Sequence, residues 1–253
     1  MLRFFRRIRQ NLLAEKKFTK YLFYAFGEII LVVIGILIAL AINNANQKRL
    51  TEKNEVTYLM GLKEEFQTSK LKLKELIAVN QDNYNGAKQI LEYTGDPSAT
   101  PSEEEFSKVL YSTFSTDIAF NPNNSLLQEI INSGNLKNLS NPELRIQLTN
   151  WISTIEDIRR QEEELGIQRI KVLDMFRTND YSLRTIFEKA GVSESIGLPS
   201  TDVTESNLNL LDSKEFENNV LMFIITSYAT EEVHYRPLMQ DLDKILKLID
   251  NTK

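Results

Sequence analysis

The hydrophobic and polar positions of this chain change their spacing along the sequence, and each pattern predicts a different kind of helix. Residues 21–42 are almost continuously apolar, and Glu28 is the one charged residue among them. At about 1.5 Å per residue, a helix over this segment is about 33 Å long, which is enough to cross the hydrocarbon core of a membrane. No later segment is comparably apolar. The sequence therefore predicts a single transmembrane helix.

The apolar residues of segment 43–94 recur at helical spacing instead of in one run. They lie close to the seam of a heptad repeat, at Leu59, Leu62, Phe66, Leu73, Leu76, Ala87 and Ile90. Asn80 and Asn83 occupy positions on the same seam. No strong helix breaker stands between Ile42 and Leu50, and Gly95-Asp96-Pro97 is expected to end the helix. We therefore predict that the transmembrane helix continues outward as one helix of about 70 residues in all, whose outer part is a stalk and the first helix of a bundle.

Residues 95–253 carry further helix signals. Ser102-x-x-Glu105 is a capping box, and Asn141 followed by Pro142 is a typical helix start. The long helix that begins there has an apolar stripe at Leu144, Leu148, Trp151, Ile155, Ile158, Leu165, Val172 and Phe176. These signals predict the remainder of a helical bundle.

The last long helix is expected to begin at Asp212-x-x-Glu215, which is again a capping-box pattern. Pro237 lies inside this helix and is expected to kink or split it near Arg236, because proline has no N–H to donate. Few residues have the alternating pattern of a strand. The predicted fold class is all-α, with one N-terminal transmembrane helix that continues into a helical bundle.

Charge divides the chain at the same place as hydropathy. The formal net charge is −5, but residues 1–20 sum to +6 and the rest to −11. The basic side chains of this first segment are Arg3, Arg6, Arg7, Arg9, Lys16, Lys17 and Lys20. Met1, Phe5, Ile8 and Leu12 recur among them at helical spacing, which favours a basic amphipathic helix on an anionic membrane surface over a disordered tail. The acidic remainder argues against binding to nucleic acid.

The same charge asymmetry predicts the orientation in the membrane. Only Lys48 and Arg49 follow the span closely, so the positive-inside rule places the N-terminus in the cytoplasm. We expect a cytoplasmic segment 1–20, a transmembrane helix 21–42, a stalk and first bundle helix 43–94, and the rest of the bundle in residues 95–253. The alternative is a cleaved signal peptide, because Ala39-Leu40-Ala41 resembles a cleavage site. That triplet, however, lies inside the apolar run.

One face of the predicted span carries small and polar residues. Glu28, Gly35, Ala39 and Asn43 follow one another at helical spacing, together with Ala25 and Val32. A Gly-x-x-x-Ala pair lets two helix backbones approach closely in lipid. We therefore predict that Glu28, Gly35, Ala39 and Asn43 form an interaction face.

Glu28 allows three interpretations, because an ionised carboxylate that faces lipid is costly. It can contact another helix in an oligomer or complex. It can extend to the cytoplasmic head groups and pair with Lys17 or Lys20. It can also line a path for an ion or a proton.

Three segments carry a resemblance to a known family. They are residues 26–40, FGEIILVVIGILIAL, with Ile42-Asn43-Asn44; residues 127–136, LQEIINSGNL; and residues 141–145, NPELR. They resemble a family of single-pass proteins of unknown function from Bacteroidota-type bacteria. The family's Asn-Trp-Asn-Glu string is replaced here by residues 43–47, NNANQ. The resemblance implies a Gram-negative inner membrane and a periplasmic bundle. It implies no activity.

The search for catalytic chemistry finds little. The chain has no Cys and one His, which excludes disulfides, thiolate zinc sites and cysteine nucleophiles. Glu231-x-x-His234 matches half of a dimetal site of the ferritin type, but a single His favours a surface or packing role. Glu103–Glu105 and Glu162–Glu164 are interpreted as solvated helix faces. No cofactor or metal is expected, and the protein is predicted not to be an enzyme.

Two functions of different classes remain. The first is a membrane-anchored scaffold or interaction protein, whose partners are membrane lipids and either further copies of itself or an unknown membrane protein. The second is a component of an ion-coupled or force-transmitting complex that uses Glu28. A sensor is a further alternative, but a cytoplasmic segment of twenty residues requires a partner to pass the signal on. Loops 117–124 and 192–211 are the expected places of partner contact.

Overall fold

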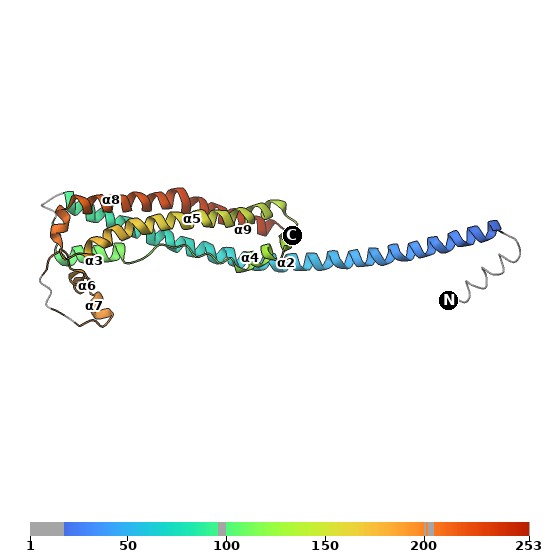
Figure 1. The fold of residues 1–253 in the computed structure, drawn as a ribbon, viewed down its shortest axis with the longest axis horizontal. Helices are drawn as coiled ribbons and strands as arrows, with labels where there is room; N and C mark the ends of the chain where they lie inside the picture. The colour runs from blue at the N-terminus through green and yellow to red at the C-terminus, as the bar shows by residue number, and fades with distance from the viewer. Residues whose placement is uncertain (1–17, 96–99, 200, 202–204, 253) are drawn as a thin grey trace. The chain divides into compact units, whose positions relative to one another are not determined.

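The computed structural model describes residues 18–95, 100–199, 201 and 205–252, and every regular element among them is helical (Figure 1). The α-helices are α2 (Phe18–Gly95), α3 (Glu103–Phe114), α4 (Ser125–Asn132), α5 (Pro142–Asp174), α6 (Leu183–Lys189), α7 (Val192–Ser195), α8 (Lys214–Ala229) and α9 (Arg236–Asn251). Short 3-10 helices cover Asn135–Asn138, Met175–Arg177 and Leu208–Asp212, and a π-helix covers Thr230–Tyr235. The predicted all-α fold is confirmed.

Helix α2 is continuous over 78 residues. Its large apolar side chains between Leu22 and Ile42 are exposed, with Phe23 as much as 75% accessible. This helix is long and apolar enough to cross a membrane. The chain separates into two compact units, of which one ends at Thr57 and the other begins at Tyr58. The second unit takes the rest of α2 as its first helix.

Three long helical elements build the second unit. Lys63 of α2 pairs with Asp250 of α9 at 2.7 Å, whereas Asn80, further along α2, bonds to Ser227 of α8 at 3.1 Å. The order of these contacts makes α8 and α9 antiparallel to α2. Gln161 of α5 likewise bonds to Thr230, and α5 is antiparallel to the C-terminal helices and parallel to α2 (Figure 1).

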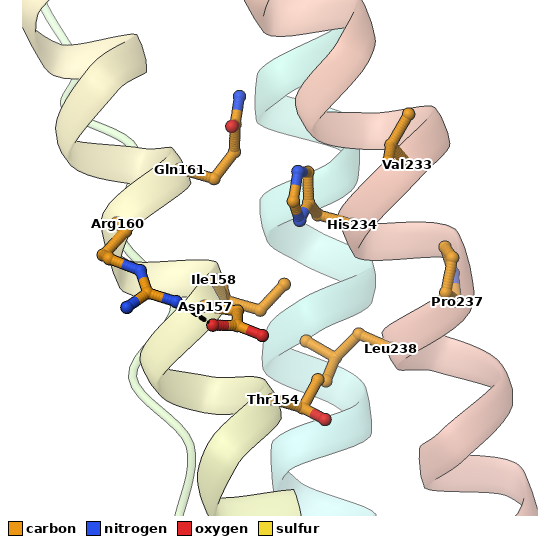
Figure 2. Close-up of a pocket in the computed structure, with 9 residues that line it drawn as sticks. All are labelled: Thr154, Asp157, Ile158, Arg160, Gln161, Val233, His234, Pro237 and Leu238. Atoms are coloured by element: carbon orange, nitrogen blue, oxygen red, sulfur yellow. Dashed lines mark hydrogen bonds and ion pairs between the residues drawn. The ribbon is translucent and has the colours of Figure 1, made fainter.

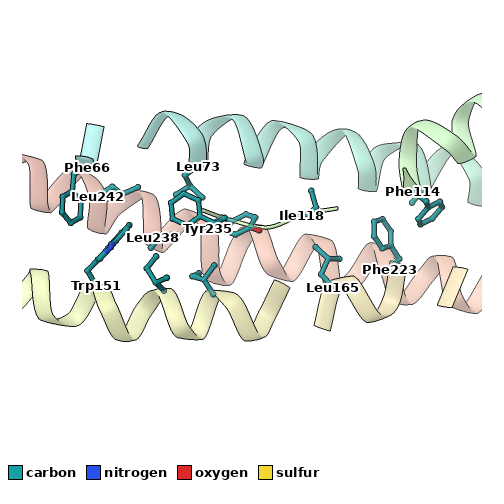
Figure 3. Close-up of a cluster of buried hydrophobic side chains, with 14 of the residues drawn as sticks. Phe66, Leu73, Phe114, Ile118, Trp151, Leu165, Phe223, Tyr235, Leu238 and Leu242 are labelled. Atoms are coloured by element: carbon teal, nitrogen blue, oxygen red, sulfur yellow. The ribbon is translucent and has the colours of Figure 1, made fainter. Parts of the chain in front are cut away.

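The core lies along the axis between these helices (Figure 3). The stripe predicted for α5 is buried at each of its eight positions, Leu144, Leu148, Trp151, Ile155, Ile158, Leu165, Val172 and Phe176. The ring of Trp151 meets Phe66 of α2 edge-on, with 5.1 Å between the ring centroids. Burial of these apolar side chains is the main favourable contribution to the stability of the bundle.

The ends of the helices follow local chemistry. Both hydrogen bonds of the capping box between Ser102 and Glu105 are present, and Asn141 accepts from two N–H groups at the start of α5. The predicted start at Asp212 is wrong by one residue, because Asp212 belongs to a 3-10 turn. The hydroxyl of Ser213 caps α8 instead, by accepting from the N–H of Phe216.

Candidate functional site

The expected break at Pro237 takes the form of a π-helix over Thr230–Tyr235. The N–H of Arg236 donates to the carbonyl of Glu231, five residues earlier. Pro237 has no N–H for the carbonyl of Val233, so the regular α pattern cannot continue through this turn. Widened turns of this kind are frequent at functional sites, and this one lies at the junction of α2, α5 and the C-terminal helices.

Glu231 points to the α2 side of the π-helix. Its side chain is 1% exposed, and its Oε1 accepts a hydrogen bond of 2.6 Å from Gln81. The guanidinium of Arg236 also reaches Oε1 at 3.0 Å, and it contacts Glu232 at 2.9 Å. The two carboxylates raise the pKa of Arg236. Arg236 therefore compensates a carboxylate that the bundle has removed from water.

His234 points to a different side, into an open groove of about 470 Å³ between α5 and the C-terminal helices (Figure 2). The floor of the groove is apolar, with Ile158 and Leu238. On its α5 wall, Asp157 forms an ion pair with Arg160. The acidic and basic groups of this wall neutralise each other, so the groove provides hydrogen-bonding groups above an apolar floor.

Glu231 and His234, which match half of a dimetal site in the sequence, point to different sides of the π-helix. In an α-helix, residues three positions apart lie near the same face. The π-helix has more residues per turn, and it turns Glu231 toward Gln81 while His234 lines the groove. Among the described residues, no group of three or more His, Asp or Glu is placed to hold a metal ion.

A second buried carboxylate lies inside the bundle. Oε1 of Glu162 on α5 accepts a bond of 2.6 Å from the hydroxyl of Tyr235 and one of 2.8 Å from the N–H of Phe120. Burial raises the pKa of Glu162, and these two bonds oppose that effect. Burial and the neighbouring carboxylate also raise the pKa of Tyr235. The expectation that Glu162 lies on a solvated face is therefore wrong.

Glu162 belongs to a set of side chains that hold segment 115–124 against the long helices. The carboxylate of Glu65 accepts from the N–H groups of Leu126 and Leu127, at the start of α4. Arg169 donates to the carbonyls of Phe114 and Ser115. Loop 117–124 is thus bound to its own bundle, and its Ile118 and Phe120 are buried. Because of these contacts, loop 117–124 offers a smaller exposed surface to a partner than its sequence indicates.

The face expected in the span has the geometry of a regular helix. Glu28, Gly35, Ala39 and Asn43 all lie in α2, and at about 100° per residue they fall within a sector of about 80°. Gly35, Ala39 and Asn43 are exposed, and Glu28 is half-buried. Apart from its chain neighbours and the nearby backbone of its own helix, no atom lies within 4 Å of the place that a Cβ would take at Gly35. The helix places these four residues on one side, and Gly35, Ala39 and Asn43 are exposed there.

Most of the basic residues expected at the membrane surface lie outside the part of the chain that the structure describes. Arg3, Arg6, Arg7, Arg9, Lys16 and Lys17 lie outside the described residues, and Lys20 lies in the first turn of α2.

Sequence reasoning missed Glu65, Glu162 and Tyr235. A signal exists for Glu162, because it is four residues after Ile158 and therefore lies on the apolar stripe of α5. Tyr235 and Glu65 have no comparable local signal. Their partners, Glu162 and the start of α4, are 73 and about 60 residues away in the chain.

Comparison with known protein families identifies the family of the chain. Residues 28–159 match the model of a family of unknown function, DUF6090. The chain belongs to this family. The DUF6090 match begins within the apolar half of α2 and ends within α5, so it includes Glu65 and the span face, whereas Glu162 and the π-helix lie beyond it. No curated protein and no solved structure matches the chain.

Proposed function

We propose that the protein is a non-enzymatic, membrane-anchored interaction protein of the bacterial inner membrane. Residues 21–42 cross the membrane, residues 1–20 lie on its cytoplasmic surface, and the bundle stands in the periplasm. The proposal is carried by α2, whose N-terminal part exposes apolar side chains while its C-terminal part is the first helix of a bundle. Exposed apolar side chains along such a length are favourable in lipid and costly in water.

The second part of the proposal concerns what the anchor contacts. Gly35 and Ala39 allow another helix to approach closely. Asn43 extends the same face with an amide that favours a polar partner in lipid, and Glu28 lies on this face as well. We infer that this face packs against a second copy of the chain or against another membrane protein. The contact would recruit the periplasmic bundle to a membrane complex.

Membrane orientation is tested with single cysteines, because the chain has none of its own. Gln10→Cys reports on the basic segment, and Ser153→Cys reports on an exposed position of α5. An impermeant maleimide applied to spheroplasts is expected to label the cysteine at 153, and to label the one at 10 only after lysis. The reverse pattern, or a mature chain that has lost its first 41 residues, contradicts the proposal.

Assembly is tested by the mass of the complex extracted from native membranes in mild detergent. A homo-oligomer or a stable complex with another membrane protein supports the proposal, and a clean monomer contradicts it. Glu28→Gln separates a structural role of the carboxylate from a working one. Loss of assembly indicates helix contact, whereas an intact complex that has lost its activity favours ion coupling through Glu28.

A further inference from the structure

A second hollow lies at the other end of the bundle from Trp151, between α3, the end of α5 and α6. Its volume is about 280 Å³. The walls are mainly apolar and include the aromatic rings of Tyr111, Phe114, Phe176 and Phe187. Tyr111 and Phe187 meet edge-on, with 6.1 Å between their ring centroids. Apolar walls of this kind favour an apolar ligand. If the ligand carries an aromatic ring, that ring can pack edge-on against the rings of the wall.

Two arginines, Arg169 and Arg177, also line this hollow, whereas no Asp or Glu is among its described lining residues. Arg169 donates to the carbonyls of Phe114 and Ser115, at the end of α3. These bonds offset the partial negative charge of that helix end. They use two of the five N–H groups of the guanidinium, and the others can donate to an anion.

Arg177 is the more accessible of the two cations. Its side chain is 65% exposed, and its ion pair, at 2.9 Å, joins the 3-10 helix Met175–Arg177 to Asp174, the last residue of α5. An exposed pair of this kind contributes little to stability, so a carboxylate that arrives at the hollow can compete for the guanidinium. The combination of apolar walls and arginines selects a ligand with an apolar body and a negative end.

We propose that this hollow binds a small carboxylate with an apolar tail, whose tail lies between the aromatic walls and whose carboxylate is received by Arg177 and Arg169. The volume is close to the lower limit of about 300 Å³ for pockets that hold drug-sized ligands, which favours a single short tail. The inference is independent of the membrane orientation proposed above.

The test uses the full chain in lipid nanodiscs and phenylbutyrate as the probe. Binding is followed by saturation-transfer NMR, with empty nanodiscs to subtract partition into lipid. We expect a dissociation constant on the order of 1 mM for a ligand of this size. The neutral amide, phenylbutyramide, is expected to bind about tenfold more weakly. Equal binding of the acid and the amide, or no binding of the acid, overturns the proposal.

Variants separate the hollow from the rest of the surface. Arg177→Gln is expected to weaken binding about fivefold, and Arg159→Gln is its matched control, because Arg159 makes the same kind of exposed ion pair on α5 and does not line the hollow. Ser115→Trp places a large ring at an exposed lining position and is expected to abolish binding, with an unchanged unfolding midpoint. Equal effects of the two arginine variants, or wild-type binding by Ser115→Trp, contradict the assignment.

Discussion

The hydroxyl of Tyr235 donates a hydrogen bond of 2.6 Å to Oε1 of Glu162, and both side chains lie in the core of the bundle. The same carboxylate oxygen accepts from the N–H of Phe120. One acidic group therefore joins α5, the π-helix and segment 115–124. Because a buried carboxylate without partners is costly, these bonds make the three elements depend on one another.

Tyr235→Phe is expected to destabilise the protein by about 1–3 kcal/mol, since the buried carboxyl group of Glu162 loses a hydrogen bond. The single Trp151 is 2% exposed, so its fluorescence reports unfolding in urea. Tyr228→Phe, at a tyrosine that is 48% exposed, is the control and should change stability by less than about 0.5 kcal/mol. Equal effects of the two variants would show that the bond to Glu162 contributes nothing.

Glu162 is expected to make stability depend on pH. Burial holds the pKa of Glu162 above its usual range in the folded chain, so the folded chain binds this proton more tightly than the unfolded chain does. The resulting stabilisation is fully present below the usual pKa, about 4.3, and is lost as the pH rises through the raised value. In urea titrations at several pH values, the free energy of unfolding of the wild type, relative to that of Glu162→Gln, should fall as the pH rises from the usual pKa of a glutamate through the raised pKa of Glu162. A constant difference contradicts the prediction.

Gly86 allows α3 to pack closely against α2. A Cβ at this position would collide with the hydroxyl oxygen of Thr113, and Thr113 is branched and buried. Gly86→Ala is therefore expected to cost about 1–2 kcal/mol, after the gain in helix propensity is included. Gly61→Ala is the control, because its Cβ would meet only the flexible end of Leu126.

The double variant Gly86→Ala, Thr113→Ala tests the cause of that cost. Removal of the branched side chain should recover at least part of the stability lost in Gly86→Ala. Unfolding of both variants is again followed by the fluorescence of Trp151. If the second substitution only adds a further loss, the close approach to Thr113 is not the reason for the glycine.

Arg236→Gln should leave the carboxylate of Glu231 buried without its cation, although the bond from Gln81 remains. We expect a clear loss of stability, but one below the full cost of breaking a buried pair, because Arg236 is 56% exposed. Arg159→Gln, which breaks an exposed pair with Glu156, should cost less than about 0.5 kcal/mol. In the double variant with Glu231→Gln, the loss should be smaller than in Arg236→Gln alone.

Gly35→Leu is expected to weaken association in the membrane about tenfold, since a large side chain holds two helices apart. Gly27 provides the matched control. It also lies in the apolar half of α2, and a Cβ there would meet no atom within 4 Å apart from its chain neighbours and the nearby helix backbone. It is, however, about 100° around the helix from Glu28. Gly27→Leu should leave the mass of the detergent-extracted complex unchanged. Equal loss of assembly in both variants contradicts an interaction face at Gly35.

Much of the fold could be predicted because its signals are local. The all-α class, the apolar half of α2 and the stripe of α5 follow from hydrophobic spacing over a few turns. The caps at Ser102 and Asn141 follow from side chains that bond within three residues. The geometry of the span face, from Glu28 to Asn43, also needs only a regular helix.

The burial of Glu162 and the form of the break at Pro237 depend on residues that are distant in the sequence. The chain places Glu162 in an acidic run that reads as solvated, and only the approach of Tyr235 and Phe120, 73 and 42 residues away, allows it to be buried. Pro237 predicts a break in the last helix. The tertiary structure decides that this break widens into a π-helix and turns Glu231 toward Gln81, 150 residues away. The reason is that a buried carboxylate is stable only where other elements supply donors.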